Sequence, residues 1–221
     1  MNAARRDRPG RRRTLERLVD QAVQRSAGED KLAAVRRENP GITPAEAIKR
    51  LEKQYLRSSA RLGGAVGAAA AYPGVGTLAA TGLTGAQTAA FLSASANHVM
   101  AVAAVHGVAV DDVERRRTLL LAALLGEDGA RAVSGQLGLG TLYWARAAIT
   151  RLPLGTVKMV NKALTRRLVR FGLTRAAAVS LGRLAPFGVG AAIGYQGTKM
   201  LGKNVVAGTR EAFGPPPASF D

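Results

Sequence analysis

Residues 62–110 read LGGAVGAAAAYPGVGTLAATGLTGAQTAAFLSASANHVMAVAAVHGVAV, and none of them carries a formal charge at neutral pH. Only His98 and His106 could acquire a charge by titration. The segment is long enough for two membrane crossings of about 20 residues each. Its apolar residues are largely Ala, however, interspersed with Gly, and both contribute little transfer free energy compared with Leu, Ile or Phe. Length alone therefore does not distinguish a membrane-inserted segment from a buried one.

A turn divides this uncharged segment into two parts. The sequence YPGVG at 72–76 combines a proline with two glycines, which predicts a break between a helix near 63–71 and a helix over 77–106. Small residues at this frequency let helix backbones approach closely. We expect close helix crossings at four glycines: Gly64, Gly67, Gly82 and Gly85. Such a helical hairpin suits either the core of a soluble protein or insertion into lipid, and both interpretations stay open at this point.

The surrounding sequence predicts an all-α fold. Aromatic residues make up only 5% of the 221 residues, and the apolar residues are mostly Ala, Leu and Val, which favour helix packing over strands. Thr43-Pro44-Ala45-Glu46 has the pattern of a capping box with proline at the first helical position. Asp111-Asp112-Val113-Glu114 marks another helix start. We therefore predict a compact helical domain over 43–213 around the central uncharged Ala/Gly-rich hairpin.

The segments on either side of 43–213 are expected to be appendages. Residues 1–13 are rich in arginine around Pro9-Gly10 and poor in apolar groups, which predicts a disordered basic N-terminal arm. A short amphipathic helix from Thr14 completes the segment 1–42. The tail 214–221 contains three successive prolines and should not be helical.

The net charge of +17 is unevenly distributed. No acidic residue lies between Asp128 and Glu211, so the cations there need counter-charges from elsewhere. Within this region, basic residues recur every fourth position from Lys158, and an apolar line follows the other side of the same predicted helix. We expect the apolar line to face the core and the basic line to bind an anionic surface together with the arm. The candidate binding residues are Lys158, Lys162, Arg166, Arg167, Arg170, Arg5, Arg6, Arg11, Arg12 and Arg13.

No pattern predicts catalysis, a metal site or a cofactor. The chain has no cysteine, which excludes disulfides, cysteine-ligated zinc and thiol catalysis. His98 and His106 are separated by about 80° on a helix and have no acidic residue between them. Ser93 and Ser95 lack the glycines of a nucleophile elbow. We therefore expect a protein that is not an enzyme.

The order and spacing of three motifs resemble the EcsC family. They are the Pro73-Gly74-Val75-Gly76 break, the Asp111-Asp112 helix start, and Pro186-Phe187-Gly188-Val189-Gly190 near the end of the chain. The similarity covers roughly Thr43 to Phe213. It implies a bacterial α-helical protein associated with a membrane, in a family named after a component encoded beside an ABC transporter. Transporter components are therefore the protein partners that this resemblance implies, and it implies no catalytic residues.

Two functions are compatible with these features. The leading expectation is a non-enzymatic accessory protein on the cytoplasmic side of an anionic membrane, either peripheral or inserted through the hairpin. The N-terminus contains arginines where a secretory signal would have an apolar core, which favours the cytoplasmic side. The alternative is a nucleic-acid-binding protein that uses the arm and the basic line on phosphates. No helix-turn-helix, RNP or zinc-finger pattern supports this alternative. The sequence gives neither a ligand nor an oligomeric state.

Overall fold

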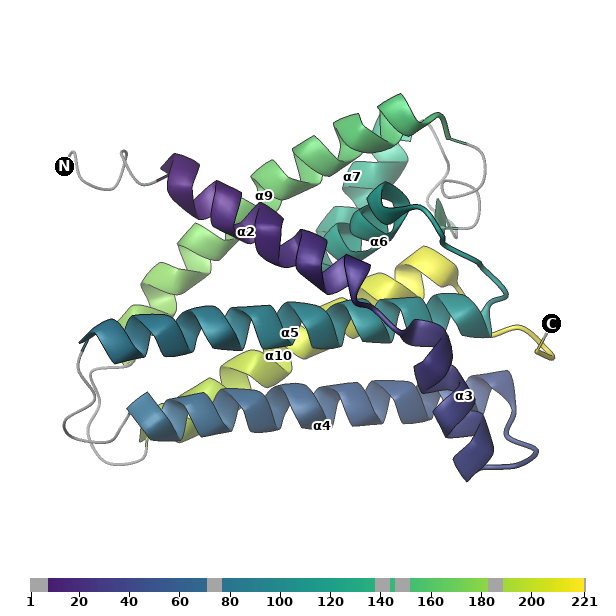
Figure 1. Ribbon diagram of the computed structural model, residues 1–221, viewed down its shortest axis with the longest axis horizontal. Helices are drawn as coiled ribbons and strands as arrows, with labels where there is room; N and C mark the ends of the chain where they lie inside the picture. The colour runs from purple at the N-terminus through teal and green to yellow at the C-terminus, as the bar shows by residue number, and fades with distance from the viewer. Residues whose placement is uncertain (1–7, 71–76, 138–143, 146–151, 183–188, 221) are drawn as a thin grey trace.

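A computed structural model describes residues 8–70, 77–137, 144–145, 152–182 and 189–220 of the protein. Within these residues it contains eight helices and no strand, which confirms the prediction of an all-α fold (Figure 1). The helices are α2 (Arg8–Gln24), α3 (Gly28–Glu38), α4 (Pro44–Ala70), α5 (Thr77–Val105), α6 (Val113–Leu125), α7 (Glu127–Leu137), α9 (Leu154–Gly182) and α10 (Val189–Phe213).

The two predicted helix starts are confirmed by their hydrogen bonds. At the start of α4, the Thr43 amide donates to Glu46 Oε2 at 3.0 Å, and the Glu46 amide donates to Thr43 Oγ1 at 3.3 Å. This reciprocal pair is a capping box. At the start of α6, the Arg115 amide donates to Asp112 Oδ1 at 3.0 Å. Helix α6 ends at Gly126, whose φ of 63° lies in a region that glycine adopts without a steric penalty.

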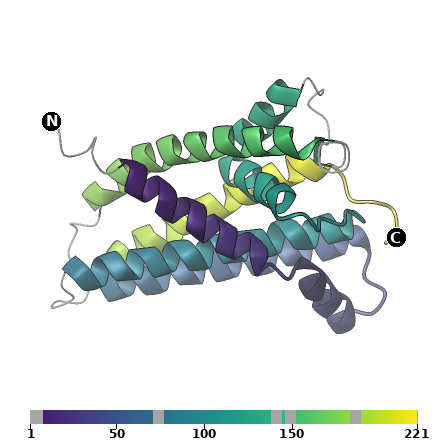
Figure 2. The same ribbon diagram turned by 45° about the horizontal axis from the view of Figure 1, so that its top comes forward.

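Helices α4 and α5 form the predicted hairpin, although the incoming helix is longer than expected. Residues 63–70 are not a separate helix but the last part of α4, which begins at Pro44. The turn at 72–76 lies outside the described residues. Helix α10 packs extensively along α4 and also contacts α5, so these three long helices lie side by side (Figures 1 and 2).

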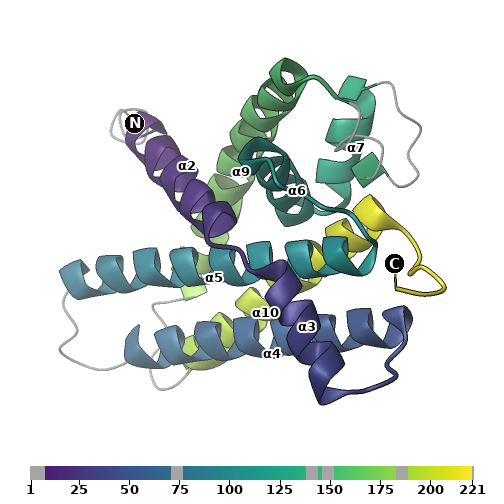
Figure 3. The same ribbon diagram turned by 45° about the vertical axis from the view of Figure 1, so that its right-hand side comes forward.

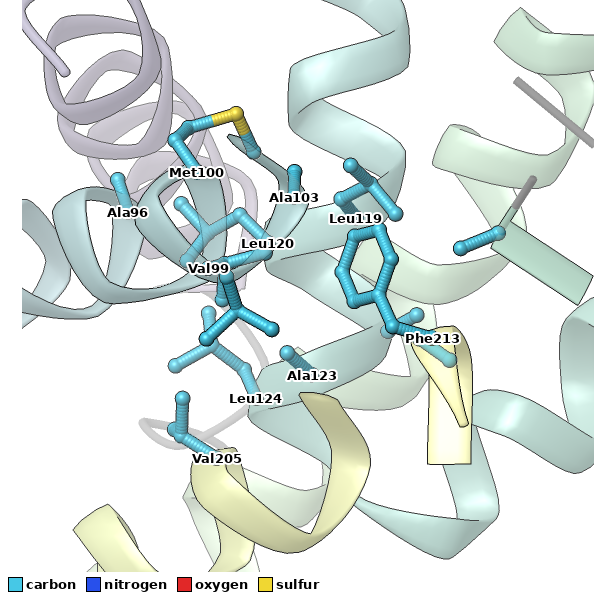
Figure 4. Close-up of a cluster of buried hydrophobic side chains, with 14 of the residues drawn as sticks. Ala96, Val99, Met100, Ala103, Leu119, Leu120, Ala123, Leu124, Val205 and Phe213 are labelled. Carbon is cyan, nitrogen blue, oxygen red and sulfur yellow. The ribbon is translucent and has the colours of Figure 1, made fainter. Parts of the chain in front are cut away.

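The core is centred on the second half of α5. Val99, Ala101 and Val105 are each at most 1% exposed there. Helix α6 contributes an almost continuous buried run from Leu119 to Leu125, and α10 contributes Val205 and Phe213 (Figure 4). Helices α2, α3, α4, α6 and α10 all contact α5. The prediction of a central helix covered by the others therefore holds for this half, whereas Ala86 and Ala90 in the first half are exposed.

The N-terminal segment differs from the prediction of an arm followed by one short helix. Helix α2 already begins at Arg8, and a second helix, α3, follows it. An ion pair between Arg12 and Glu16, one turn apart at 3.0 Å, offsets part of the repulsion among the arginines. Val23 of α2 and Val35 of α3 are buried in the same core as the residues after 43. Position 42 is therefore not a boundary between an appendage and a core, and residues 1–7 lie outside the described part.

The prediction of close crossings at glycines of the hairpin is wrong where the structure tests it. A Cβ atom on Gly85 would meet nothing within 4 Å, and one on Gly64 would meet Tyr195 at an ordinary 3.6 Å. The surroundings of Gly67 and Gly82 lie outside the described part of the structure. The close approaches are elsewhere, because the crossing points depend on which distant segments meet. A Cβ on Gly28 would lie 2.4 Å from the Met100 carbonyl carbon, and one on Gly208 would lie 2.8 Å from the Ala123 oxygen.

Candidate anion-binding surface

Helix α9 presents the basic line outward, as its spacing predicts. Lys158, Lys162, Arg166, Arg167 and Arg170 are all exposed. The opposite line packs inward: Val157, Val160 and Leu164 are 3%, 2% and 1% exposed, and Leu168 packs against the core. In the described part of the chain, the first four of these cations form no ion pair. Their charge is therefore available to an external anion.

The arginines of the predicted arm are only partly placed beside this line. Helix α2 crosses near α9 and contacts it (Figures 1 and 2). Arg13 on α2 is exposed, whereas Arg12 is paired with Glu16. Arg11 is helical, but the surroundings of its side chain are not described, and Arg5 and Arg6 precede the described residues. The structure therefore brings α2 into contact with the helix that carries the basic line.

A second basic row lies on α4 and is absent from the candidate residues chosen from the sequence. It consists of exposed cations that recur along the outer face of the helix: Lys49, Arg50, Lys53, Arg57 and Arg61. No ion pair joins any of them to another described residue. The only acidic residue on this face, Glu46, accepts hydrogen bonds from the Thr43 amide and hydroxyl, which lower the pKa of its carboxyl group. The row could have been found from the same four-residue spacing that marks α9.

The start of this row lines a groove. Lys49, Arg50, Lys53 and Arg57 border a hollow of about 620 Å³ against the turn at 39–42. Glu46 also lines this hollow, so four cations face one carboxylate there, and such an excess of one sign in a concave surface attracts counter-ions. The α4 row is therefore a cationic surface with a defined concavity at one end.

At one end of the molecule, the long helices contain no acidic residue. The helices α4 after Glu52, α5, α9 and α10 before Glu211 contain no Asp or Glu. The end of α4 and the start of α5 lie at the same end of the molecule as the end of α9 and the start of α10, at the left of Figure 1. Of the acid-containing helices, α3, α6 and α7 lie toward the opposite end, whereas α2, which carries Glu16 and Asp20, runs from the upper left of Figure 1 toward the centre. We call the end where these long helices meet the acid-free end.

Three successive arginines on α6 have internal roles and do not belong to the basic surface. Arg115 donates through Nη2 to the Leu152 oxygen at 3.1 Å, and Arg116 donates through Nε to the Val110 oxygen. Arg117 forms an ion pair with Asp20 of α2 at 3.0 Å. These contacts fix the first turn of α6 against α2 and against the segment that leads into α9.

A buried amide connects the same turn to α9. Asn161 is 3% exposed and donates through Nδ2 to Glu114 Oε2 at 2.8 Å and to the Glu114 backbone oxygen at 2.9 Å. The Thr118 hydroxyl donates to Asn161 Oδ1 at 2.8 Å. Buried polar groups that satisfy one another in this way fix the rotation of the helix that carries them. The network therefore contributes to the outward orientation of the α9 cations.

Of the residues considered for catalysis, His98, His106 and Ser95 are buried and Ser93 is half-buried. His98 is 3% exposed and stacks on Tyr55, with ring centroids 4.7 Å apart. Neither ring nitrogen of His98 has a hydrogen-bond partner, and burial lowers the pKa of the imidazole to about 3. The Ser95 hydroxyl bonds to Tyr55 Oη at 2.8 Å and donates to the Phe91 oxygen at 2.7 Å. The Ser95 hydroxyl therefore makes its hydrogen bonds within the core, to α4 and to its own helix.

The two histidines do not face each other. His106 stacks on Phe213 of α10, with ring centroids 5.4 Å apart, while His98 stacks on α4. Within the described residues, no group of three or more His, Asp or Glu side chains is arranged to hold a metal ion.

One helical stretch, Gly85–Val105 of α5, is long and apolar enough to cross a membrane. Of the most apolar 18 residues in this stretch, 56% are buried inside the protein. A core helix of a soluble protein meets the same criterion, so this stretch is weak support for a membrane span.

No protein-family model matches the chain, and comparisons with curated proteins and with solved structures also found no match. The resemblance to the EcsC family stays a prediction.

Proposed function

We propose that this protein is a non-enzymatic membrane-associated protein that binds an anionic membrane with its acid-free end. The observation that carries this proposal is the pair of exposed basic rows on α4 and α9, together with the absence of Asp and Glu from α5, from α9, from α4 after Glu52 and from α10 before Glu211. The cytoplasmic side of the membrane is the side that we propose, because cytoplasmic leaflets carry anionic lipids. In this position the rows contact lipid phosphates, and the uncharged end of α4 and the uncharged starts of α5 and α10 approach the acyl boundary.

Exposed apolar side chains beside the cations favour lipid over a purely electrostatic partner. On α9, Met159 is 67% exposed and follows Lys158 directly. On α10, Met200 is 63% exposed and lies between Lys199 and Lys203 in the sequence. Alternation of cations with flexible apolar side chains is typical of helices that lie at a membrane interface. Contacts with a nucleic-acid backbone would use the cations but leave these methionines exposed.

Shallow insertion fits the packing better than a transmembrane hairpin. The second half of α5 is covered by α2, α3, α4, α6 and α10. A lipid-spanning position for this half would require these helices to separate from it. Ala86 and Ala90 in the first half of α5 are exposed, so this half can reach lipid without unfolding the core around the second half.

The electrostatic part of the proposal is tested by a matched pair of triple variants. Changing Lys158, Lys162 and Arg166 together to Gln should weaken binding to vesicles of phosphatidylglycerol and phosphatidylcholine by about 10- to 100-fold, since each surface cation contributes about 1 kcal/mol. The control changes Arg25, which follows α2, and Lys31 and Arg37 of α3 to Gln; all three are exposed, so the control removes the same amount of charge. Vesicle co-sedimentation measures the affinity of both.

Three outcomes of this experiment would contradict the proposal. Equal losses in both triple variants would mean that only net charge matters. Binding to phosphatidylcholine vesicles as tight as to the anionic ones would remove the role of the cations. Tight binding to duplex DNA at matched ionic strength, without vesicle binding, would favour the nucleic-acid alternative.

Insertion of the acid-free end is tested separately with single cysteines, because the natural chain contains none. Cysteine replaces Ala86 in the exposed first half of α5, or Ala109 just after α5 at its other end, and each variant carries a nitroxide label. When anionic vesicles are added, the label at 86 should lose most of its accessibility to a water-soluble paramagnetic reagent. The label at 109 should stay accessible. Protection at 109 but not at 86 would show that the opposite end binds the membrane.

A further inference from the structure

A second concavity lies at the end of the molecule opposite the acid-free end. It is formed by the start of α4, the end of α5, the end of α10 and the chain that follows α10, all of which lie close together in Figure 3. Its volume is about 640 Å³, within the range of small-ligand sites. This pocket lies away from the acid-free end, and Lys49 is the one residue that it shares with the α4 row.

The walls of the pocket are mainly apolar. Ile48 of α4, Val102 of α5 and Phe213 of α10 line it, and Pro215 and Pro216 form an exposed lip. Phe213 is held in place by stacking on His106. Five apolar residues from separate segments thus surround a space that is large enough for an alkyl chain.

The charged groups at the rim determine which head group fits. Glu52 is 7% exposed and accepts two hydrogen bonds from the Arg210 guanidinium, at 2.6 and 2.5 Å, so these two charges neutralise each other. Of the remaining lining residues, Lys49 and Glu211 are charged and exposed. A head group near Glu211 would meet a like charge if it were anionic.

Lys49 is shared between this pocket and the cationic groove on α4. It lines both hollows, and in the groove it is joined by Arg50, Lys53 and Arg57. An anion at Lys49 therefore lies beside three further cations that have no ion-pair partner among the described residues. The groove also contains the carboxylate of Glu46, so its lining has four cations and one anion, and Lys49 is the side chain at which the groove meets the apolar pocket.

We infer that the pocket binds a single-chain anionic amphiphile, with its alkyl chain against Val102 and Phe213 and its anionic head at Lys49. The apolar lining provides affinity for the chain, and the groove cations provide the preference for a negative head. A fatty acid and a single-chain alkyl phosphate both combine an alkyl chain with an anionic head group, so both are candidate ligands. The inference does not rest on membrane binding, because Lys49 is the only lining residue that the pocket shares with the basic rows and the ligand is tested as a free molecule without vesicles.

The test is isothermal titration calorimetry of the full chain with laurate below its micellar concentration, with 1-dodecanol and with pyrophosphate. We expect saturable one-to-one binding of laurate, weaker binding of dodecanol, which lacks the charge, and weaker binding of pyrophosphate, which lacks the chain. Dodecyl phosphate in place of laurate distinguishes a preference for phosphate from one for carboxylate.

Two variants test the binding of the alkyl chain and the binding of the anionic head group separately. Ala45 lines the pocket and is half-buried, so Ala45→Phe should fill the space and weaken laurate binding by about 10-fold or more. Lys49→Gln should weaken laurate but leave dodecanol unchanged. The matched control is Ala33→Phe on the exposed face of α3, which should bind laurate like the natural protein.

Several results would overturn the inference. They are an absence of laurate binding, equal affinity for laurate and dodecanol, undiminished laurate binding by Ala45→Phe, or pyrophosphate binding as tight as laurate. Far-UV circular dichroism of each variant checks the fold. If Ala45→Phe is unfolded, Ala45→Leu, which adds less volume, replaces it, and unchanged laurate binding by that variant contradicts the pocket.

Discussion

Replacing Gly208 by Ala is expected to lower the free energy of unfolding by about 1 to 3 kcal/mol. The added Cβ would lie 2.8 Å from the Ala123 oxygen, 2.9 Å from the Gly126 Cα and 3.0 Å from the Ala123 Cα. These are backbone atoms of α6 and its C-terminal cap, so no side-chain rotation can make room. Helix α10 must then move away from α6, which loosens the core around Val205. The higher helix propensity of Ala offsets only about 1 kcal/mol of this cost.

Gly197 is the matched control, because it lies on the same helix but has no neighbour within 4 Å of an added Cβ. Gly197→Ala should raise the free energy of unfolding by about 0.5 to 1 kcal/mol, since alanine loses less backbone entropy in a helix. Urea unfolding followed by circular dichroism measures both variants. If Gly208→Ala were as stable as Gly197→Ala, α10 and α6 would not pack as closely as the structure shows.

Replacing His98 by Leu should make the protein markedly less sensitive to acid. In the unfolded chain the imidazole takes up a proton as the pH falls through about 6.5. In the folded protein burial lowers its pKa to about 3, so it stays neutral. The unfolded state therefore binds more protons between these two values, and the natural protein loses about 1.4 kcal/mol of stability per pH unit as the pH falls across this window.

The leucine variant lacks this proton uptake but keeps every other titrating group. At pH 7 its stability should differ from that of the natural protein by about 1 kcal/mol or less, because removal of two unbonded nitrogens offsets the lost stacking on Tyr55. At about pH 4.5 it should be more stable than the natural protein by about 3 kcal/mol. Urea unfolding of both proteins across this range gives the difference directly. A constant difference would mean that His98 is accessible to protons in the folded state.

The features predicted correctly from the sequence depend on residues close together in the chain. The capping box at Thr43 and Glu46 involves groups three positions apart, and so does the cap from Asp112 to Arg115. The outward orientation of Lys158 and Lys162 follows from the same periodicity that turns Val157 and Val160 inward. Local hydrogen bonds and helix periodicity are fixed by sequence spacing, so no knowledge of the rest of the fold was needed.

The role of the N-terminal helices was missed because composition describes a segment in isolation. Arginine-rich residues 8–13 have too few apolar groups to fold alone, which is why a disordered arm was expected. They continue a helix whose later residues, Val19 and Val23, are covered by the rest of the protein. Burial of these valines stabilises the whole of α2, including its charged start, since most helix stability in proteins comes from tertiary packing.

The sequence by itself determined an all-α protein with its caps, its uncharged hairpin and the two faces of α9, because each of these depends on positions a few residues apart. Only the tertiary structure decided that Gly28 and Gly208 allow close approach while Gly85 does not. It alone joined Glu52 to Arg210 and placed Lys49 between a basic groove and an apolar pocket. These relations join residues far apart in the chain, and they arise from the way in which the long helices cross.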